Sequence, residues 1–196
     1  MKNVDEYYNR TINNKPNKLL MKFFDMKLDR DINEKTAIDL GCGTGNDTIF
    51  LLDKGFKVTA VDKENKVINI IKDKIQNNKN LSFIIDDFAK IRLHKVNLIT
   101  ANFSLHFCNP LYFDKFMCEI TENISLGGYF VGNFLGKEDQ WFSDKTKTFV
   151  DRNKIQEIFK GFDIIHFNEE KYYKDSVSIK NKYWHVFNVI VQKKEE

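Results

Sequence analysis

The sequence has 196 residues, of which 42% are hydrophobic and 30% charged, with a formal net charge of +3. This length fits one domain with one core, and so mild a charge gives no reason to expect nucleic-acid binding. The sequence has no apolar run of membrane-spanning length or signal-peptide core, and Cys42, Cys108 and Cys118 form no C-x-x-C pair. We therefore expect a cytoplasmic protein without a disulfide framework, a metal site or a membrane partner.

The predicted elements alternate between helices and strands. Apolar residues at helical spacing, capping residues and glycine stops predict helices at 4–9, 17–28, 46–54, 64–77, 109–123 and 153–160. Runs of β-preferring residues predict strands at 36–40, 56–62, 81–85, 96–101, 129–135, 162–167 and 184–192. The pair Gly127-Gly128 is interpreted as a turn before the fifth strand. This alternation predicts a single α/β domain with a parallel, doubly wound sheet.

Residues 36–47 are the most informative segment. A short apolar strand with Asp39 near its end runs into a loop with a glycine at every second position, at Gly41, Gly43 and Gly45. Glycine adopts positive φ readily and lets a ligand lie against the backbone. A strand that leads through such a loop into a helix builds the nucleotide sites of open α/β sheets. The segment therefore predicts a nucleotide-like ligand at the carboxyl end of this strand.

The spacing of the loop argues against two common phosphate sites. A dinucleotide fingerprint has its third glycine where this chain has Asn46, and a P-loop ends in Gly-Lys-Ser/Thr, whereas Gly45 is followed here by Asn46 and Asp47. An acid at the start of the following helix would also repel a phosphate. We therefore expect a ligand without phosphates.

A second carboxylate supports a nucleoside ligand. Asp62 ends the predicted strand 56–62, roughly 20 residues after the first glycine, where an acid is placed to bind a ribose. An ionised Asp only accepts hydrogen bonds, so it suits the two hydroxyls of a ribose and disfavours a 2′-phosphate.

The pattern Asp39-x-Gly41-x-Gly43-x-Gly45, followed by Asp62, resembles class I S-adenosylmethionine-dependent methyltransferases. The resemblance covers about residues 34–193. It implies a single-domain Rossmann-like sheet, mostly parallel, with one antiparallel strand near the edge. It also implies an N-terminal helical lid segment at residues 1–33 and a class I methyltransferase domain at residues 34–196.

The same resemblance implies S-adenosylmethionine as the cofactor. Asp87 or its close rival Asp86 would accept from the adenine amino group, and Arg10 would pair with the methionine carboxylate. The cofactor-binding residues that it implies are Asp39, Gly41, Cys42, Gly43, Gly45, Asp62, Lys63, Asp87, Phe88, Asn102 and Arg10.

The acceptor side is less sharply indicated. The order of Phe/Tyr-rich turn, helix, strand and final Trp184-His185 strand resembles small bacterial tellurite-resistance-type methyltransferases. This resemblance implies Tyr8, His106, Trp141 and Trp184 as substrate-contacting residues, with His106 and His185 as catalytic candidates. His106 fits a core histidine equally well, and a tryptophan in an edge strand is often a core residue.

We expect an enzyme that transfers a methyl group to a small molecule, such as a thiol or a chalcogen oxyanion like tellurite. One alternative is methylation of RNA or another macromolecule, which a basic face around the pocket would favour. Another is a non-catalytic S-adenosylmethionine-binding regulator. The segment 101–107 lacks the Asn/Asp-Pro-Pro-Tyr/Phe signature of resembling enzymes, which disfavours adenine or cytosine amino-methylation in DNA, and we do not expect a nucleic-acid partner. The sequence leaves open the acceptor, the use of a general base and the oligomeric state.

Overall fold

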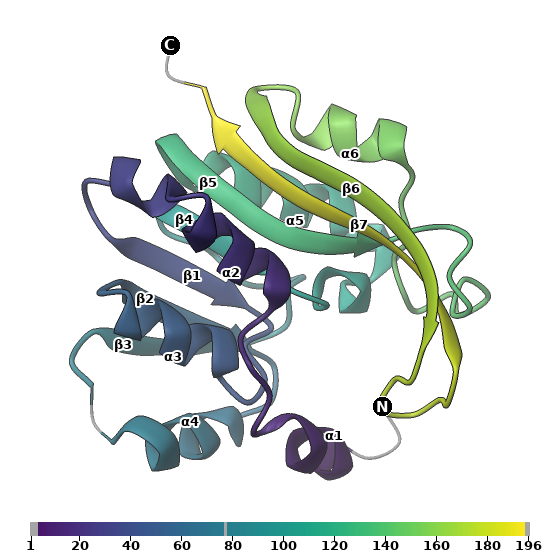
Figure 1. The fold of residues 1–196 in the computed structure, drawn as a ribbon, viewed down its shortest axis with the longest axis horizontal. Coiled ribbons are helices and arrows are strands. Elements are labelled where there is room, and N and C mark those ends of the chain that lie inside the picture. Colours follow the sequence, from purple (N-terminus) through teal and green to yellow (C-terminus); the bar gives the residue numbers. More distant parts are fainter. Residues whose placement is uncertain (1–3, 77, 195–196) are drawn as a thin grey trace.

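The computed structural model describes residues 4–76 and 78–194. Its strands form one seven-stranded sheet in the order β3-β2-β1-β4-β5-β7-β6 (Figure 1). The strands are β1 Thr36–Leu40, β2 Lys57–Asp62, β3 Leu81–Ile85, β4 Val96–Ala101, β5 Ile124–Leu135, β6 Phe162–Lys174 and β7 Lys182–Lys193. The strands β1 to β5 pair in parallel, and β7 runs antiparallel to both of its neighbours, β5 and β6. The predicted doubly wound sheet with one antiparallel strand near its edge is therefore confirmed.

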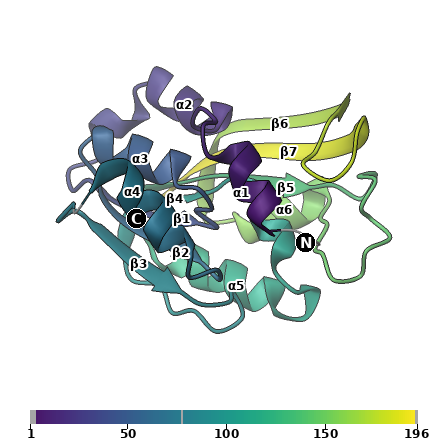
Figure 2. The ribbon, with the colours of Figure 1, turned by 90° about the horizontal axis from the view of Figure 1, so that it is seen from below.

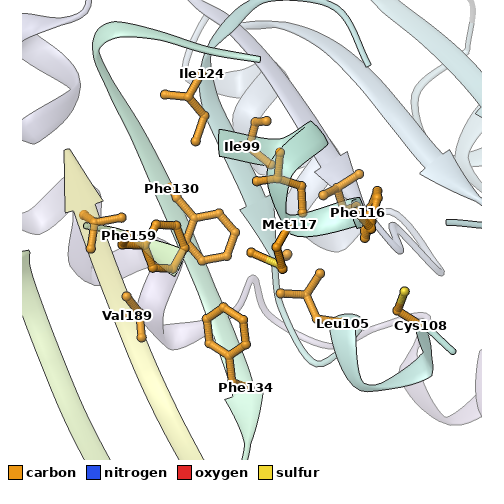
Figure 3. Close-up of a cluster of buried hydrophobic side chains, with 14 of the residues drawn as sticks. Ile99, Leu105, Cys108, Phe116, Met117, Ile124, Phe130, Phe134, Phe159 and Val189 are labelled. Carbon is orange, nitrogen blue, oxygen red and sulfur yellow. The ribbon is translucent and has the colours of Figure 1, made fainter. Parts of the chain in front are cut away.

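Helices cover both faces of the sheet (Figure 2). They are α1 Val4–Thr11, α2 Lys18–Asp25, α3 Asn46–Asp53, α4 Val67–Ile75, α5 Pro110–Glu122 and α6 Arg152–Ile158, with short 3-10 turns η1 Leu28–Asp31 and η2 Leu105–Phe107. Apolar residues of α2 and α3 pack on one face, and those of α5 and α6 pack on the other. Figure 3 shows the core on the face covered by α5 and α6, where Phe130 and Phe134 of β5 lie near Met117 of α5 and Phe159. Two buried layers thus fix the sheet from both sides.

Several predicted boundaries differ from the structure. β5 begins at Ile124, so the pair Gly127-Gly128 lies inside the strand, at a register shift between Val96 and Leu98 of β4. A Cβ on Gly128 would lie 2.8 Å from the carbonyl oxygen of Asn97, so the glycine permits a close backbone approach there. The prediction of a turn was therefore wrong.

The bounds of several other elements also differ. The helix predicted at 17–28 ends at Asp25, and that predicted at 64–77 spans Val67–Ile75, while Asn77 lies outside the described residues. β6 continues to Lys174, seven residues past its predicted end, because it pairs with β7 over that whole length. Of the proposed domain ranges, residues 1–3, 77 and 195–196 lie outside the described part of the chain.

The strand order locates a crevice. The chain passes from β1 outward to β2 and β3 and then returns to β4 on the other side of β1. In open α/β sheets, ligands bind beyond the carboxyl ends of the strands at such a reversal. No helix among residues 4–76 and 78–194 has both the length and the apolar character needed to cross a membrane.

Candidate functional site: a cavity above the glycine loop

A cavity of about 230 Å³ opens at the carboxyl ends of the central strands. Its walls come from α1, the glycine loop and the segments that follow β2, β3 and β4. The lining residues are Tyr7, Tyr8, Gly41, Gly43, Asp62, Lys63, Glu64, Asp86, Asp87, Phe88, Phe103, Ser104 and Phe107. The cavity therefore lies at the reversal of the strand order, and several predicted site residues line it.

The three glycines of the loop have different surroundings. All have positive φ, at 75° for Gly41, 50° for Gly43 and 78° for Gly45. A Cβ on Gly41 would lie 2.3 Å from the Cβ of Ser104, and one on Gly45 would lie 2.4 Å from Cγ1 of Ile71. A Cβ on Gly43 would have no neighbour closer than Cε1 of Tyr7, at 3.8 Å, across the cavity lining. Gly43 is thus the glycine that keeps space open for a ligand, whereas Gly41 and Gly45 permit close packing.

Asp62 is fixed at the cavity wall by the backbone. Its Oδ2 accepts from the backbone N–H of Gly43 at 3.0 Å, and its Oδ1 accepts from that of Glu64 at 3.0 Å. Burial raises the pKa of this carboxyl, and the two backbone hydrogen bonds oppose the rise. Each carboxylate oxygen has two lone-pair sites, so both oxygens retain acceptor capacity for two ligand hydroxyls.

Two further acids stabilise the loop from behind. Asp39 is buried and its Oδ2 accepts from Oγ1 of Thr48 at 2.6 Å; burial raises its pKa to about 8. Asp47 accepts from the backbone N–H of Asn17 at 2.7 Å and from Nδ2 of Asn102 at 2.8 Å. These three residues, Asp39, Asp47 and Asn102, do not line the cavity. The expectation that Asp47 would meet the ligand at close range was therefore wrong. Asp47 instead binds Asn17 at the start of α2 and Asn102 after β4.

Two acids, Asp86 and Asp87, follow the carboxyl end of β3 at the cavity wall. Oδ1 of Asp86 accepts from the backbone N–H of Asp87 at 2.7 Å, and Oδ1 of Asp87 accepts from that of Ala89 at 2.9 Å. Both residues line the cavity, so the choice between them for the adenine amino group remains open. Phe88 also lines it and stacks on Phe116 with ring centroids 4.7 Å apart.

The N-terminal helix closes one side of the site. Tyr7 and Tyr8 line the cavity, whereas the Arg10 guanidinium donates to the backbone carbonyl of Val177 in the β6–β7 connection. Arg10 therefore joins α1 to the hairpin and does not face the cavity. Cys42 is buried beside the loop, and burial raises its thiol pKa well above the ordinary value, so it is not a thiolate.

Lys74 of α4 fastens this N-terminal segment to the glycine loop. Its Nζ donates to the carbonyl oxygen of Ile12 at 2.7 Å, to that of Thr44 at 2.8 Å and to Oδ1 of Asn46 at 2.9 Å. Hydrogen bonds to a charged group are stronger than neutral ones. Lys74 therefore sets the position of the loop relative to the segment after α1.

We expect Lys74→Met to weaken binding of S-adenosylhomocysteine by about tenfold. A tenfold loss corresponds to about 1.4 kcal/mol, close to the free energy of one hydrogen bond to a charged group. The matched control is Lys72→Met, on an exposed position of the same helix. Calorimetric titration of both variants measures the effect. Equal affinities in the two variants would show that the Lys74 contacts do not position the loop.

The four acceptor-side candidates behind the cavity are His106, His185, Trp141 and Trp184, and none of them is a lining residue. His106 is buried, its Nε2 has no hydrogen-bond partner among the described residues, and burial lowers its pKa to about 3. Nδ1 of His185 accepts from the backbone N–H of Glu138 at 3.1 Å, and its Nε2 lies 3.0 Å from Oε1 of Glu169. Neither histidine is placed as a base at the cavity.

The cavity also contains residues that were not selected from the sequence. Tyr7, Glu64, Phe103, Ser104 and Phe107 line it. Ser104 Oγ is buried and, within residues 4–76 and 78–194, has no hydrogen-bond partner. An orphaned polar atom at a cavity wall is a candidate ligand contact. Tyr7 lies inside the predicted first helix, and the other four residues follow the predicted second and fourth strands. These positions were the only signal in the sequence.

Three features of the cavity fit a nucleoside sulfonium ligand. Gly43 leaves space for the ligand beside the backbone, Asp62 can accept further hydrogen bonds, and Ser104 Oγ has no hydrogen-bond partner among the described residues. The negative charges of Asp47 and Asp62 help to raise the pKa of buried Asp39, so the field around the loop favours a cation over a phosphate. The residues present therefore fit a cationic ligand with a ribose.

Comparisons with known proteins agree with this geometry. Residues 37–128 match the model of a methyltransferase-domain family. A probable ribosomal RNA small subunit methyltransferase A from Methanococcoides burtonii is 30% identical over 100 residues, which make up 50% of this chain and 37% of that protein. The chain thus covers little more than a third of this curated relative.

Two crystal structures match nearly the whole chain. TehB from Haemophilus influenzae matches with a TM-score of 0.75 at 19% identity, over 97% of this chain and 67% of that one. The N-methyltransferase NodS from Bradyrhizobium japonicum, in complex with S-adenosylhomocysteine, matches with a TM-score of 0.66 at 13% identity, over 98% of this chain and 100% of that one.

Proposed function

We propose that this chain, which carries a methyltransferase domain with the class I S-adenosylmethionine-dependent fold, transfers a methyl group from S-adenosylmethionine to a small molecule. The observation that carries the proposal is the pairing of Asp62 with Gly43. The carboxylate accepts from the backbone N–H of Gly43, the cavity-lining glycine at which a Cβ would meet no atom closer than 3.8 Å. A ribose bound to Asp62 places the rest of the nucleoside over this cradle.

The cofactor residues follow from this placement. Asp62 would hold the ribose hydroxyls, and Asp86 or Asp87 with Phe88 would hold the adenine. Ser104 Oγ lacks a hydrogen-bond partner among the described residues and would lie 3.2 Å from a Cβ on Gly41, and we propose that it meets the amino-acid end of the cofactor. We propose in addition that residues 1–33 act as a lid, because Tyr7 and Tyr8 of α1 close the cavity and Lys74 ties the following residues to the loop.

Methyl transfer from a sulfonium requires the protein mainly to orient the two reactants. When bound, S-adenosylmethionine supplies an electrophilic methyl group on a sulfonium. Burial raises the pKa values of both Tyr7 and Tyr8, so both phenols stay protonated at neutral pH. The chain's residues therefore align the two reactants and exclude water, which is worth about 7–11 kcal/mol in favourable cases.

The charge of the cavity favours a small molecule over RNA. In the described part of the chain, its lining includes the acids Asp62, Glu64, Asp86 and Asp87 but Lys63 as the single lysine or arginine. Nucleic-acid sites are built from basic side chains that neutralise phosphates. The likeness to ribosomal RNA methyltransferases extends over half of this chain, so RNA remains the competing acceptor to be tested.

A transfer assay with methyl-labelled S-adenosylmethionine separates the alternatives. The acceptors offered are glutathione, sodium tellurite, simple aromatic heterocycles and a small-subunit ribosomal RNA transcript. We expect label in a small-molecule product and none in RNA. Label in RNA alone would replace the proposal with RNA methylation. Binding of S-adenosylhomocysteine without transfer to any acceptor would favour a regulator instead.

A further inference from the structure

The acceptor side of the cavity is aromatic and uncharged. The lining residues from α1 and from the segment after β4 are Tyr7, Tyr8, Phe103, Ser104 and Phe107. Both tyrosines remain neutral because burial raises their pKa values. The carboxylates of the cavity come from the carboxyl ends of β2 and β3 and the residues that follow them. An acceptor that enters beside the cofactor therefore meets flat rings and three neutral hydroxyl groups, those of Tyr7, Tyr8 and Ser104.

Phe103 is held in a conformation that phenylalanine rarely adopts. Its φ is 51°, in the left-handed region, at the end of β4. Strained residues of this kind persist where the surrounding structure fixes them, and they gather at ligand sites. The ring of Phe103 meets that of Trp184 edge to face, with centroids 5.6 Å apart and an interplanar angle of 79°. Its position at the cavity is thus set by a second ring behind it.

That second ring is itself immobilised. The Nε1 of Trp184 donates to the carbonyl oxygen of Lys174 at 3.0 Å. Nζ of Lys182 lies 3.6 Å from the centroid of Trp184 and 4.3 Å from that of Trp141. The ammonium pairs with Asp139 at 2.6 Å, and both side chains are fully buried. A cation between two indoles, paired with a buried carboxylate, makes a rigid support for Phe103.

The charges near this wall disfavour an anionic acceptor. Lys63 is the single lysine or arginine that lines the cavity, in the part of the chain that the structure describes, against four carboxylates. Lys147 lies 5.5 Å from the ring centroid of Phe107, but its ammonium pairs with Asp144 at 2.7 Å. An oxyanion such as tellurite would therefore be repelled, whereas a neutral ring would not be.

We infer, as a step that rests on the proposed function, that the acceptor is an uncharged aromatic heterocycle that stacks on Phe103 and is methylated on an unprotonated ring nitrogen. The nitrogen lone pair forms the N–C bond as the C–S bond breaks, and the electron pair of the C–S bond stays on sulfur. The positive charge passes from the sulfonium to the ring, and no proton leaves. Because no proton leaves, the reaction needs no general base. This agrees with the cavity lining, in which both tyrosines stay protonated and His106 is absent. The cationic product is stabilised by the nearby carboxylates and aromatic faces.

The test uses quinoline, isoquinoline and benzimidazole as probes. Their dissociation constants are measured by calorimetry with the full chain saturated by S-adenosylhomocysteine, and their kcat/KM values are compared with those of sodium tellurite, glutathione and the RNA transcript. We expect at least one heterocycle to bind and to have the highest kcat/KM. Phe103→Ala should weaken its binding about tenfold and leave the affinity for S-adenosylhomocysteine unchanged. The matched control is Phe142→Ala, an exposed phenylalanine outside the cavity lining.

Phe103→Leu serves where the alanine variant fails to fold, since it keeps an apolar side chain but loses the flat face. The inference is wrong if none of the three heterocycles binds the complex, if tellurite, glutathione or RNA has a higher kcat/KM, or if the Phe103 variants bind the heterocycle as well as wild type. A chain that does not bind S-adenosylhomocysteine at all contradicts the proposed function instead.

Discussion

Asp62→Ala is expected to weaken binding of S-adenosylhomocysteine by at least about tenfold. The carboxylate would accept hydrogen bonds from two ribose hydroxyls, and a hydrogen bond to a charged group contributes about 1.5–3 kcal/mol, where about 1.4 kcal/mol is a factor of ten. The loss also releases the Gly43 and Glu64 N–H groups, which Asp62 now holds at 3.0 Å. Calorimetric titration at fixed pH and salt measures the change directly.

Asp62→Asn separates charge from shape, because the amide keeps one acceptor oxygen and the side-chain volume. We expect an intermediate affinity for this variant. Asp53→Ala, at an exposed position of α3, is the control for a general loss of one negative charge. An Asp62→Ala protein that binds as tightly as wild type would remove the ribose assignment.

Gly43→Val is expected to abolish measurable binding of S-adenosylhomocysteine while leaving the protein folded. The new side chain would start 3.8 Å from Cε1 of Tyr7, so it meets no protein atom closely and extends into the cavity instead. The φ of 50° adds strain, of about 1–2 kcal/mol for a residue with a Cβ and more for a branched one. Thermal unfolding and calorimetry together distinguish blocked binding from lost structure.

The strain has its own control in Gly55→Val. Gly55 ends α3 with φ of 84°, and a Cβ there would have only Cδ of Lys35 within reach, at 4.0 Å. This variant should lose stability to a similar degree and bind normally. If both variants lose binding equally, the strain rather than the cavity explains the effect. Gly43→Val protein with normal affinity would contradict the placement of the ligand over the loop.

The fold and the meeting of the glycine loop with Asp62 at one cavity could be predicted because their signals are local. Gly41, Gly43 and Gly45 are close in sequence, and Asp62 follows at the end of the next strand, so adjacent parallel strands bring them together. The N-cap at Asn109 is local as well, and its side chain does accept from the backbone N–H of Leu111. Boundaries failed where pairing overrode local preference, as at Gly127-Gly128, where a strand continues through a turn-like pair.

The acceptor side could not be predicted because it depends on long-range packing. Trp184 and His185 are neighbours in β7, and successive residues of a strand point to opposite faces. Trp184 contacts Phe103 at the cavity wall, whereas His185 packs against Gly136, where a Cβ would lie 2.3 Å from its ring. Arg10 likewise has a guanidinium suited to a carboxylate, but the fold places it at the β6–β7 connection. Sequence spacing alone carries no information on these contacts.

The most direct test of the central claim is calorimetric titration of the full chain with S-adenosylhomocysteine at two temperatures. We predict saturable binding of one molecule per chain, since the cavity over Gly43 and beside Asp62 is where the two motifs converge. Binding that is lost in Gly43→Val and weakened in Asp62→Ala would place the ligand there. The absence of binding at both temperatures, in protein shown to be folded, would contradict the assignment of this cavity to S-adenosylmethionine.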